Sequence, residues 1–260
     1  MSVPNLKVAL FQYDIAWENP AKNIEKLDSW IHNAAGKADL IILPEMFLTG
    51  FSMNAALIAQ EMSGAGVNWM KSTAQKNNVS ILGSLAINEN GNYFNRLVMS
   101  DNKGVISYYD KRHLFRMGKE HLTYSQGVDK TIFRVSSWNI LPLVCYDLRF
   151  PVWSRNAELQ YDVLIYVANW PEPRRDAFLA LLKARAIENQ CYVLAVNRVG
   201  VDGTGVSYVG DSIAFDPKGK CIVTSNKEEI LLCELSSSEL SSFREKFPVH
   251  LDADKFTIYS

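Results

Sequence analysis

Residues 139–151 read NILPLVCYDLRFP, an apolar run that meets a cysteine and then a polar turn. A short run of this kind, with almost no polar side chains, is typical of a strand buried on both faces of a sheet. Pro151 favours the first turn of a helix, which we expect to extend to about residue 160. Cys145 therefore lies at the carboxyl end of a strand, just before an expected helix.

Two earlier stretches end in the same way. The apolar residues 40–43 lead through Pro44 to Glu45, and the strand predicted at residues 105–110 leads to Lys111. In open α/β sheets, ligands bind outside the carboxyl ends of the strands. If these strands are neighbours, Glu45, Lys111 and Cys145 converge on one site. Taken alone, each residue also fits an ordinary role, as a surface acid, a solvated lysine or a core cysteine.

A thiol, a carboxylate and an ammonium group can together attack a carbonyl carbon. The thiol of Cys145 must lose its proton to attack, and Glu45 is the candidate general base. The ammonium of Lys111 and the backbone N–H of Tyr146 are candidates for stabilising the resulting oxyanion. A nearby cation and a helix N-terminus are expected to lower the pKa of the thiol. A second acid, Glu120, is expected to orient Lys111 or to assist the later attack by water.

The rest of the chain alternates between helix and strand patterns. Periodicity predicts helices near residues 20–35, 67–77, 151–160 and 175–189, and Ser236 with Glu239 forms a capping box for a last one. Strands are predicted at residues 6–13, 39–43, 79–87, 93–100, 105–110, 131–135, 139–144, 163–168, 191–197, 211–215 and 229–234. This order predicts an α/β fold with a mixed sheet in two layers. We expect a single domain over residues 1–260, with residues 247–260 as an irregular tail.

The bulk properties of the chain exclude several kinds of partner. The 260 residues carry a net charge of -1, so no basic field is available to hold a nucleic acid or an anionic membrane. The first residues lack a signal-peptide pattern, and no apolar run reaches the roughly 18 residues of a membrane span. The expected partner is therefore a small molecule rather than a nucleic acid or a membrane.

The four cysteines form no C-x-x-C pair, and no histidine stands at a metal-ligand offset from them. We expect reduced thiols and a cytoplasmic location, with no metal site and no cofactor. Cys191, Cys221 and Cys233 lie in strand-like runs without charged neighbours, so they are expected to be buried apolar residues.

Several blocks of the chain carry a resemblance to a known family. Residues 43–47 (LPEMF), 109–115 (YDKRHLF), 144–151 (VCYDLRFP) and 184–190 (ARAIENQ) resemble the nitrilase superfamily of carbon–nitrogen hydrolases. The resemblance covers essentially the whole chain. It implies a Glu–Lys–Cys triad of Glu45, Lys111 and Cys145, with Glu120 as a second active-site glutamate. It also implies a four-layer α-β-β-α sandwich with two mixed β-sheets.

The resemblance carries an expectation about assembly as well. Members of the superfamily commonly pair two protomers, and their irregular C-terminal tail often reaches over the partner. A homodimer or larger homo-oligomer is therefore implied here. The apolar tail residues Phe256, Ile258 and Tyr259 fit such a contact.

Residues 113–118 (HLFRMG) and 166–171 (YVANWP) are similar to the bacterial omega-amidase branch of the superfamily. That branch hydrolyses the terminal amide of 2-oxoglutaramate or 2-oxosuccinamate to the oxo-diacid and ammonia, through a cysteine thioester. Arg149 fits a bidentate contact to the far carboxylate of such a substrate, or else it pairs with Asp147 or another loop acid. The resemblance implies that Trp170 lines the pocket, although an aromatic residue at a strand end is most often a packing residue.

Three other functions remain open. The first is another amidase of the superfamily, acting on deaminated glutathione or on carbamoyl amines. The second is a Cys–His thiol hydrolase that uses His113 or His121 as the base. The third is a non-catalytic metabolite-binding module on an inherited fold.

Overall fold

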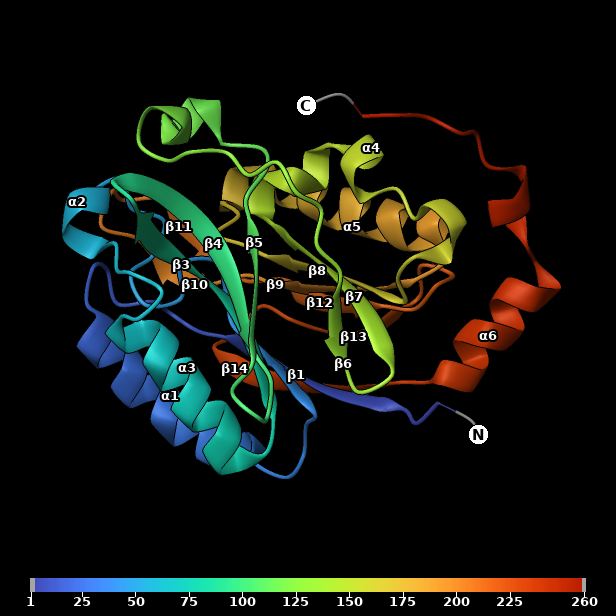
Figure 1. The fold of residues 1–260 in the computed structure, drawn as a ribbon, viewed down its shortest axis with the longest axis horizontal. Coiled ribbons are helices and arrows are strands. Elements are labelled where there is room, and N and C mark those ends of the chain that lie inside the picture. The colour runs from blue at the N-terminus through green and yellow to red at the C-terminus, as the bar shows by residue number, and fades with distance from the viewer. Residues whose placement is uncertain (1–2, 259–260) are drawn as a thin grey trace.

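Two six-stranded sheets pack face to face, and helices cover their outer faces (Figure 1). The computed structural model describes residues 3–258, so Tyr259 of the predicted tail contact lies outside the described residues. The arrangement is the four-layer α-β-β-α sandwich that the family resemblance implies. No helix in the described part of the chain has the length and apolar character to cross a membrane.

The first sheet has the strand order β14-β1-β2-β3-β4-β5. Its strands are β1 (Leu6–Gln12), β2 (Leu40–Ile42), β3 (Ser80–Glu89), β4 (Asn92–Ser100), β5 (Ile106–Asp110) and β14 (Glu229–Leu235). β1, β2 and β3 are parallel, whereas β4 reverses direction and β5 reverses it again. β5 therefore runs in the same direction as β2, and both strands end at the same edge of the sheet.

The second sheet has the strand order β13-β12-β9-β8-β7-β6. Its strands are β6 (Phe133–Val135), β7 (Trp138–Val144), β8 (Val163–Val167), β9 (Tyr192–Val196), β12 (Ser212–Phe215) and β13 (Cys221–Ser225). β7, β8 and β9 are parallel. The carboxyl ends of these three strands therefore lie together, with that of β7 carrying Cys145.

The helices α1 and α3 cover the outer face of the first sheet, and α4 and α5 lie on the side of the second (Figure 1). The helices are α1 (Pro20–Ala34), α2 (Ala55–Ile58), α3 (Ala65–Asn77), α4 (Pro151–Ser154), α5 (Arg175–Asn189) and α6 (Ser237–Lys246). The Asn19 side chain caps α1 by accepting from the N–H of Lys22, and the Ser236 side chain caps α6 by accepting from the N–H of Glu239. The predicted starts of both helices are therefore confirmed.

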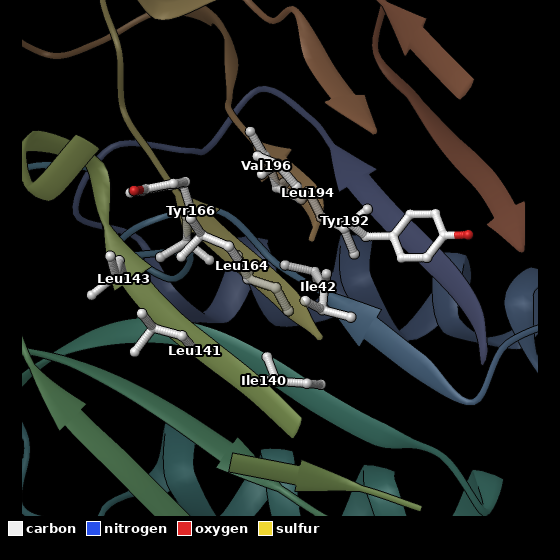
Figure 2. Close-up of a cluster of buried hydrophobic side chains, with 14 of the residues drawn as sticks. Ile42, Ile140, Leu141, Leu143, Leu164, Tyr166, Tyr192, Leu194 and Val196 are labelled. Atoms are coloured by element: carbon white, nitrogen blue, oxygen red, sulfur yellow. The ribbon is translucent and has the colours of Figure 1, made fainter. Parts of the chain in front are cut away.

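The strands β2, β8 and β9 are apolar at every position because each face of a sheet packs on a different core. In β1, Val8 and Leu10 belong to the core between the sheets, whereas Ala9 and Phe11 pack toward α1 and α3. Figure 2 shows the core between the sheets, where Ile42 of β2 joins residues of β7, β8 and β9. Burying one such aliphatic side chain stabilises the fold by roughly 1.5–3 kcal/mol. This packing holds the two sheets at a fixed separation and so fixes the site between them.

The sequence predicted convergence on the condition that the three strands carrying the candidate residues are neighbours, and they are not. β3 and β4 separate β2 from β5, and β7 belongs to the other sheet. The three strand ends meet because the sheets face each other and end at a common edge. Convergence is therefore a property of the sandwich rather than of one sheet.

Two local predictions are wrong, and one hairpin was missed. The helix expected over residues 151–160 stops at Ser154, because the backbone is extended at Arg155 and the Asn156 side chain bonds to backbone groups of Tyr161 and Asn189. A short hairpin, β10 (Val199–Val201) with β11 (Ser207–Val209), was not predicted. Cys221 is exposed rather than buried, since β13 is an edge strand.

The predicted tail has little regular structure. A 3₁₀ turn at Val249–Asp252 follows α6, and no helix or strand follows it up to residue 258. The tail side chains Phe247, Leu251, Phe256 and Ile258 are exposed. The described part of the tail therefore presents apolar groups to solvent.

Candidate active site

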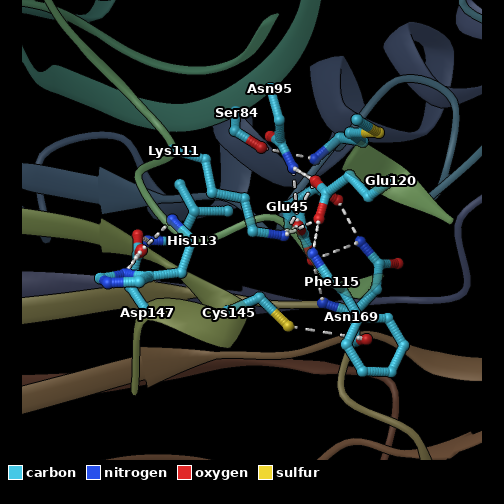
Figure 3. Close-up of polar contacts among 12 residues, drawn as sticks. Glu45, Ser84, Asn95, Lys111, His113, Phe115, Glu120, Cys145, Asp147 and Asn169 are labelled. Carbon is cyan, nitrogen blue, oxygen red and sulfur yellow. Dashed lines mark hydrogen bonds and ion pairs between the residues drawn. The ribbon is translucent and has the colours of Figure 1, made fainter. Parts of the chain in front are cut away.

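Glu45, Lys111 and Glu120 form a buried ion cluster between the sheets (Figure 3). The Nζ of Lys111 lies 2.9 Å from Oε1 of Glu45 and 3.0 Å from each carboxylate oxygen of Glu120. All three side chains are inaccessible to solvent. The structure therefore brings together the acid after β2, the lysine after β5 and the acid of the loop that follows it.

The backbone on either side of Lys111 is held at both ends. Its N–H donates to the carbonyl of Asn95 at 3.0 Å, and its carbonyl accepts from the N–H of Gly127 at 2.9 Å. Only glycine fits at position 127, because a Cβ there would lie 2.1 Å from the carbonyl oxygen of Asp110. The loop from 111 to 127 thus closes on its own start and directs the lysine and Glu120 toward each other.

Two asparagines that the sequence did not reveal position the Glu45 carboxylate. The amide of Asn95 donates to Oε1 of Glu45 at 2.8 Å and to Oε1 of Glu120 at 3.2 Å. The backbone N–H of Asn169 donates to Oε2 of Glu45 at 2.8 Å, and its side-chain amide donates to the Glu45 carbonyl at 2.6 Å. The only signal for them in the sequence is an asparagine within or directly after a strand, which does not identify a partner.

Cys145 sits at a sharp turn between β7 and a 3₁₀ turn at residues 145–149. Its φ of 42° lies in the left-handed region, which is strained for a residue with a side chain. The turn is fixed by the Asp147 carboxylate, which accepts from the N–H of Val144 at 3.0 Å. A turn of this kind at a strand end exposes the side chain of a nucleophile.

The same carboxylate of Asp147 binds the two residues on its other side. It accepts from the hydroxyl of Tyr109 at 2.8 Å and from the backbone N–H of His113 at 3.0 Å, and it lies 2.8 Å from Nδ1 of His113. The imidazole of His113 also stacks on Phe150 at 3.8 Å. Figure 3 shows this ring on the side of Asp147, away from the sulfur of Cys145.

The position of His113 argues against the alternative of a Cys–His thiol hydrolase. Within residues 3–258, neither His113 nor His121 lines the cavity or forms a hydrogen bond to Cys145. His121 is exposed. The geometry therefore does not support a histidine as the base, whereas it places the Glu45 carboxylate and Cys145 in one cavity.

Burial and neighbouring charges set the protonation of the cluster. Burial alone would lower the pKa of Lys111, but the carboxylates of Glu120 and Glu45 outweigh it and hold that pKa above its usual value. Burial raises the pKa of Glu120 despite the opposing charge of Lys111. The lysine is therefore a permanent cation, shared between two acids.

The expected lowering of the thiol pKa is wrong. Burial raises the pKa of Cys145 well above its ordinary value, and the Glu45 carboxylate raises it further. The Lys111 ammonium opposes this shift without reversing it. The helix α4, which follows Cys145, has only four residues, so its dipole does little to stabilise a thiolate. The thiol is thus protonated at rest, so its attack on a carbonyl requires a base.

A cavity of about 590 Å³ opens above the cluster. Of the residues predicted at the site, those that line it are Glu45, Lys111, Cys145, Tyr146, Arg149 and Trp170. Glu120 lies behind Lys111, out of the lining. Further lining residues that the sequence did not indicate include Phe51, Phe115, Arg174, Asp202 and Tyr208.

Arg149 faces this cavity and does not pair with a loop acid. Its guanidinium lies 4.9 Å from the ring of Trp170, and no ion pair involves it in the part of the chain that the structure describes. The Asp147 carboxylate, its proposed alternative partner, is already occupied by Tyr109, His113 and a backbone N–H. The pairing of Arg149 with Asp147 is therefore wrong. Trp170 supports the arginine as well as packing on Phe178 at 5.2 Å.

No group of three or more histidine, cysteine, aspartate or glutamate side chains in the described residues is arranged to hold a metal ion.

Comparisons with known proteins agree with this geometry. The model of the carbon-nitrogen hydrolase family matches residues 7–245. The chain is 46% identical over 259 residues to the omega-amidase YafV of Escherichia coli, covering 99% of this chain and 100% of the relative. It is 36% identical to the 2-oxoglutaramate amidase of Bacillus subtilis, covering 95% and 97% of the two chains.

A solved structure is similar over nearly the same length. It is the crystal structure of a CN-hydrolase superfamily protein from Xanthomonas campestris with an arsenic adduct in the active site. The two chains are 40% identical and superpose with a TM-score of 0.97, which covers 98% of this chain and 100% of the other. Together with the family match, these likenesses establish that the chain belongs to the carbon-nitrogen hydrolase family.

Proposed function

We propose that the protein is an omega-amidase, which hydrolyses the terminal amide of a short 2-oxo acid to the oxo-diacid and ammonia. The candidate substrates are 2-oxoglutaramate and 2-oxosuccinamate. The observation that carries the proposal is the buried cluster of Glu45, Lys111 and Glu120 beside a protonated thiol at the floor of one cavity. The full-length likeness to proteins named omega-amidase and 2-oxoglutaramate amidase supports the choice of substrate.

In the first half of the reaction, the thiol of Cys145 attacks the amide carbon while Glu45 takes its proton. The carbonyl oxygen becomes an oxyanion, which the ammonium of Lys111 and the backbone N–H of Tyr146 stabilise. Glu45 then returns the proton to the amide nitrogen, the carbon–nitrogen bond breaks and ammonia leaves. The product of this half is a thioester on Cys145.

In the second half, water attacks the thioester carbon. Glu45 takes a proton from the water, and the same two donors stabilise the second oxyanion. Breaking the carbon–sulfur bond releases the new carboxylic acid and returns the proton to the thiol. Overall one water is consumed and one ammonia is formed for each amide.

Glu120 and Asn95 act on the groups that react rather than on the substrate. Glu120 binds Lys111 through both oxygens and accepts the N–H of Phe115 at 2.6 Å, which fixes the direction of the ammonium. The Asn95 amide bridges Glu45 and Glu120. We assign both a positioning role.

The far end of the substrate is assigned to Arg149, with Trp170 behind it. A guanidinium at the wall of the cavity, with no acidic partner among residues 3–258, suits a carboxylate. Removal of this anchor is expected to cost the anionic amide roughly 2–5 kcal/mol.

A longer amide is the second candidate, because the cavity volume of about 590 Å³ falls within the range of pockets that hold drug-sized ligands. The decisive test is ammonia release by the wild-type protein from a panel of amides. The panel contains 2-oxoglutaramate, 2-oxosuccinamate, deaminated glutathione, a carbamoyl amine, a neutral short amide and a nitrile. The proposal predicts the highest kcat/KM for the two oxo-acid amides. A higher value for deaminated glutathione or the carbamoyl amine would reassign the enzyme within its family.

We also propose that a single catalytic domain of residues 1–260 works as a homodimer or larger homo-oligomer. The exposed apolar residues of the tail and of the helices α4 and α5 support this assembly. They include Phe247, Leu251, Val152 and Ile187. The four free cysteines suit a reducing compartment, so we assign the cytoplasm.

A further inference from the structure

A second arginine faces the cavity of Cys145, and within the described part of the chain it too has no acidic partner. The guanidinium of Arg174 lies 5.3 Å from the ring of Phe115, across the same cavity that Arg149 lines. Neither arginine forms an ion pair with any of residues 3–258. By contrast, the next residue along the chain, Arg175, forms two hydrogen bonds with the carboxylate of Asp211.

The acids of the cavity do not neutralise these two cations. Glu45 is bound to Lys111, and Asp202 accepts hydrogen bonds from its own loop and from the hydroxyl of Tyr208. The carboxylate of Glu18 accepts from the hydroxyl of Ser52. The cavity therefore holds two arginines whose charge is not neutralised by an ion pair within the described residues.

Aromatic residues hold both guanidiniums in place. Trp170 packs against the guanidinium of Arg149, and its indole N–H donates to the backbone carbonyl of Arg174 at 2.8 Å. Phe115 packs against the guanidinium of Arg174, and Tyr146 meets Phe115 edge to face at 5.1 Å. A guanidinium packed against a ring keeps its N–H edge for a planar anion. Among residues 3–258, the side chain of Arg174 forms one hydrogen bond, to the sulfur of Met117, a weak acceptor, at 3.2 Å.

We propose that Arg174 and Arg149 together form a two-arginine subsite for a carboxylate with an adjacent oxo oxygen. Such a group presents three acceptor oxygens, more than one planar guanidinium can bind in a bidentate contact. Arg174 is thus a specificity residue, which selects amides whose far end is a 2-oxo-carboxylate. The inference rests on the proposed function, because it assumes that the amide end of the substrate reaches Cys145.

The test compares Arg174→Met with Arg116→Met as a matched control. Arg116 is exposed, belongs to the same loop as Phe115 and does not line the cavity, so its loss removes one charge from the region without touching the subsite. The kcat and KM for ammonia release are measured with 2-oxoglutaramate, with glutaramate, which lacks the oxo group, and with butanamide, which lacks both the oxo group and the carboxylate.

For Arg174→Met we expect KM for 2-oxoglutaramate to rise by roughly tenfold to a hundredfold, because the anchor acts in the ground state and the transition state alike. The KM for glutaramate rises by a smaller factor. The KM for butanamide changes less than about twofold, because butanamide has no group that Arg174 would bind. Arg174→Lys restores only part of the affinity, since an ammonium lacks the planar edge. Arg116→Met leaves the kcat/KM values of the three substrates in the same ratio as in the wild type.

A binding measurement gives a second readout. The dissociation constant of 2-oxoglutarate is measured calorimetrically with Cys145→Ala and with Cys145→Ala/Arg174→Met, after thermal unfolding confirms that both are folded. The subsite predicts weaker binding to the double variant by a similar factor. Equal binding, or an equal loss of activity on all three amides, would show that Arg174 is structural. If the wild-type protein does not prefer 2-oxoglutaramate, the proposed function itself is wrong, whatever the arginine variants do.

Discussion

The charge on each residue of the cluster depends on its neighbours rather than on its position in the sequence. The sequence indicated a thiol with a lowered pKa, whereas burial and the Glu45 carboxylate raise the pKa of Cys145. A protonated thiol must pass its proton to a base before it can attack a carbonyl carbon. This arrangement gives Glu45 the role of base in the proposed reaction.

The two neighbours of the thiol should therefore move its titration in opposite directions. Glu45→Gln removes a negative charge that disfavours the thiolate, so the pKa of Cys145 should fall. Lys111→Met removes a positive charge that favours the thiolate, so the pKa should rise. Ultraviolet absorbance of the thiolate, followed against pH with Cys145→Ala as the blank, measures both shifts. Shifts in the same direction in the two variants would refute this electrostatic account.

The same two variants should differ in rate and in stability. Glu45→Gln should lower kcat by roughly two to four orders of magnitude, as expected for loss of a general base. Lys111→Met also leaves two buried carboxylates without their cation, so it should lower the free energy of unfolding by roughly 3–5 kcal/mol. Glu45→Gln should lower the free energy of unfolding by less. Urea unfolding at pH 7 compares them with the wild type. A folded Glu45→Gln variant with the wild-type rate would remove Glu45 from the reaction.

At the scale of elements, the turn after β7 decides where the nucleophile points. Asp147 holds this turn by accepting hydrogen bonds from Val144, Tyr109 and His113. In Asp147→Asn, one acceptor oxygen is replaced by a donor, so at least one buried N–H or hydroxyl loses its partner at roughly 1–3 kcal/mol. We expect a folded protein with a lower melting temperature and a lower kcat.

An isosteric change at the next acid of the chain provides the control for that prediction. Glu158 lies on the partly exposed segment after α4 and contributes no hydrogen bond to the turn. Glu158→Gln should leave both the melting temperature and kcat close to the wild type. If Asp147→Asn behaves in the same way, the carboxylate does not control the turn.

Most strands, and the places of Glu45, Lys111 and Cys145 directly after three of them, could be predicted from the sequence because they depend on local patterns. A strand buried on both faces is a continuous apolar run, and the residue after it lies at the sheet edge. The start of the helix at Pro151 was predicted, but its end was not, since the helix stops where the side chain of Asn156 bonds to α5 and to the following turn. The hairpin β10–β11 has strands of only three residues, too short for a period to show.

Residues that act through contacts between different elements could not be predicted from the sequence either. Asn95 lies within β4, and only the register of that strand against its neighbours brings its amide to Glu45. Arg174 follows a proline in a polar segment that looks like an ordinary turn. Arg174 follows β8 of the second sheet, whereas its partner Phe115 lies in the loop after β5 of the first sheet. The place of Arg174 at the cavity therefore depends on how the two sheets pack. Such placements follow from packing and not from local propensity.

For the whole molecule, the exposed apolar side chains bear on assembly. The described tail and the helices α4 and α5 expose apolar side chains, whose burial against a second copy would stabilise a dimer by the hydrophobic effect. Sedimentation at micromolar concentration should give the mass of a dimer or a larger oligomer. A variant with Leu251→Asp and Phe256→Asp should shift the distribution toward the monomer. A wild-type monomer under these conditions would reject the assembly.

The central claim is that Cys145 forms the bond to the substrate in this site. It is tested most directly by ammonia release from 2-oxoglutaramate, measured for the wild type and for Cys145→Ala at equal concentration. We predict one ammonia and one 2-oxoglutarate per turnover for the wild type, and a Cys145→Ala protein with an unchanged melting temperature and essentially no release. Substantial ammonia release by the folded Cys145→Ala variant would contradict the account.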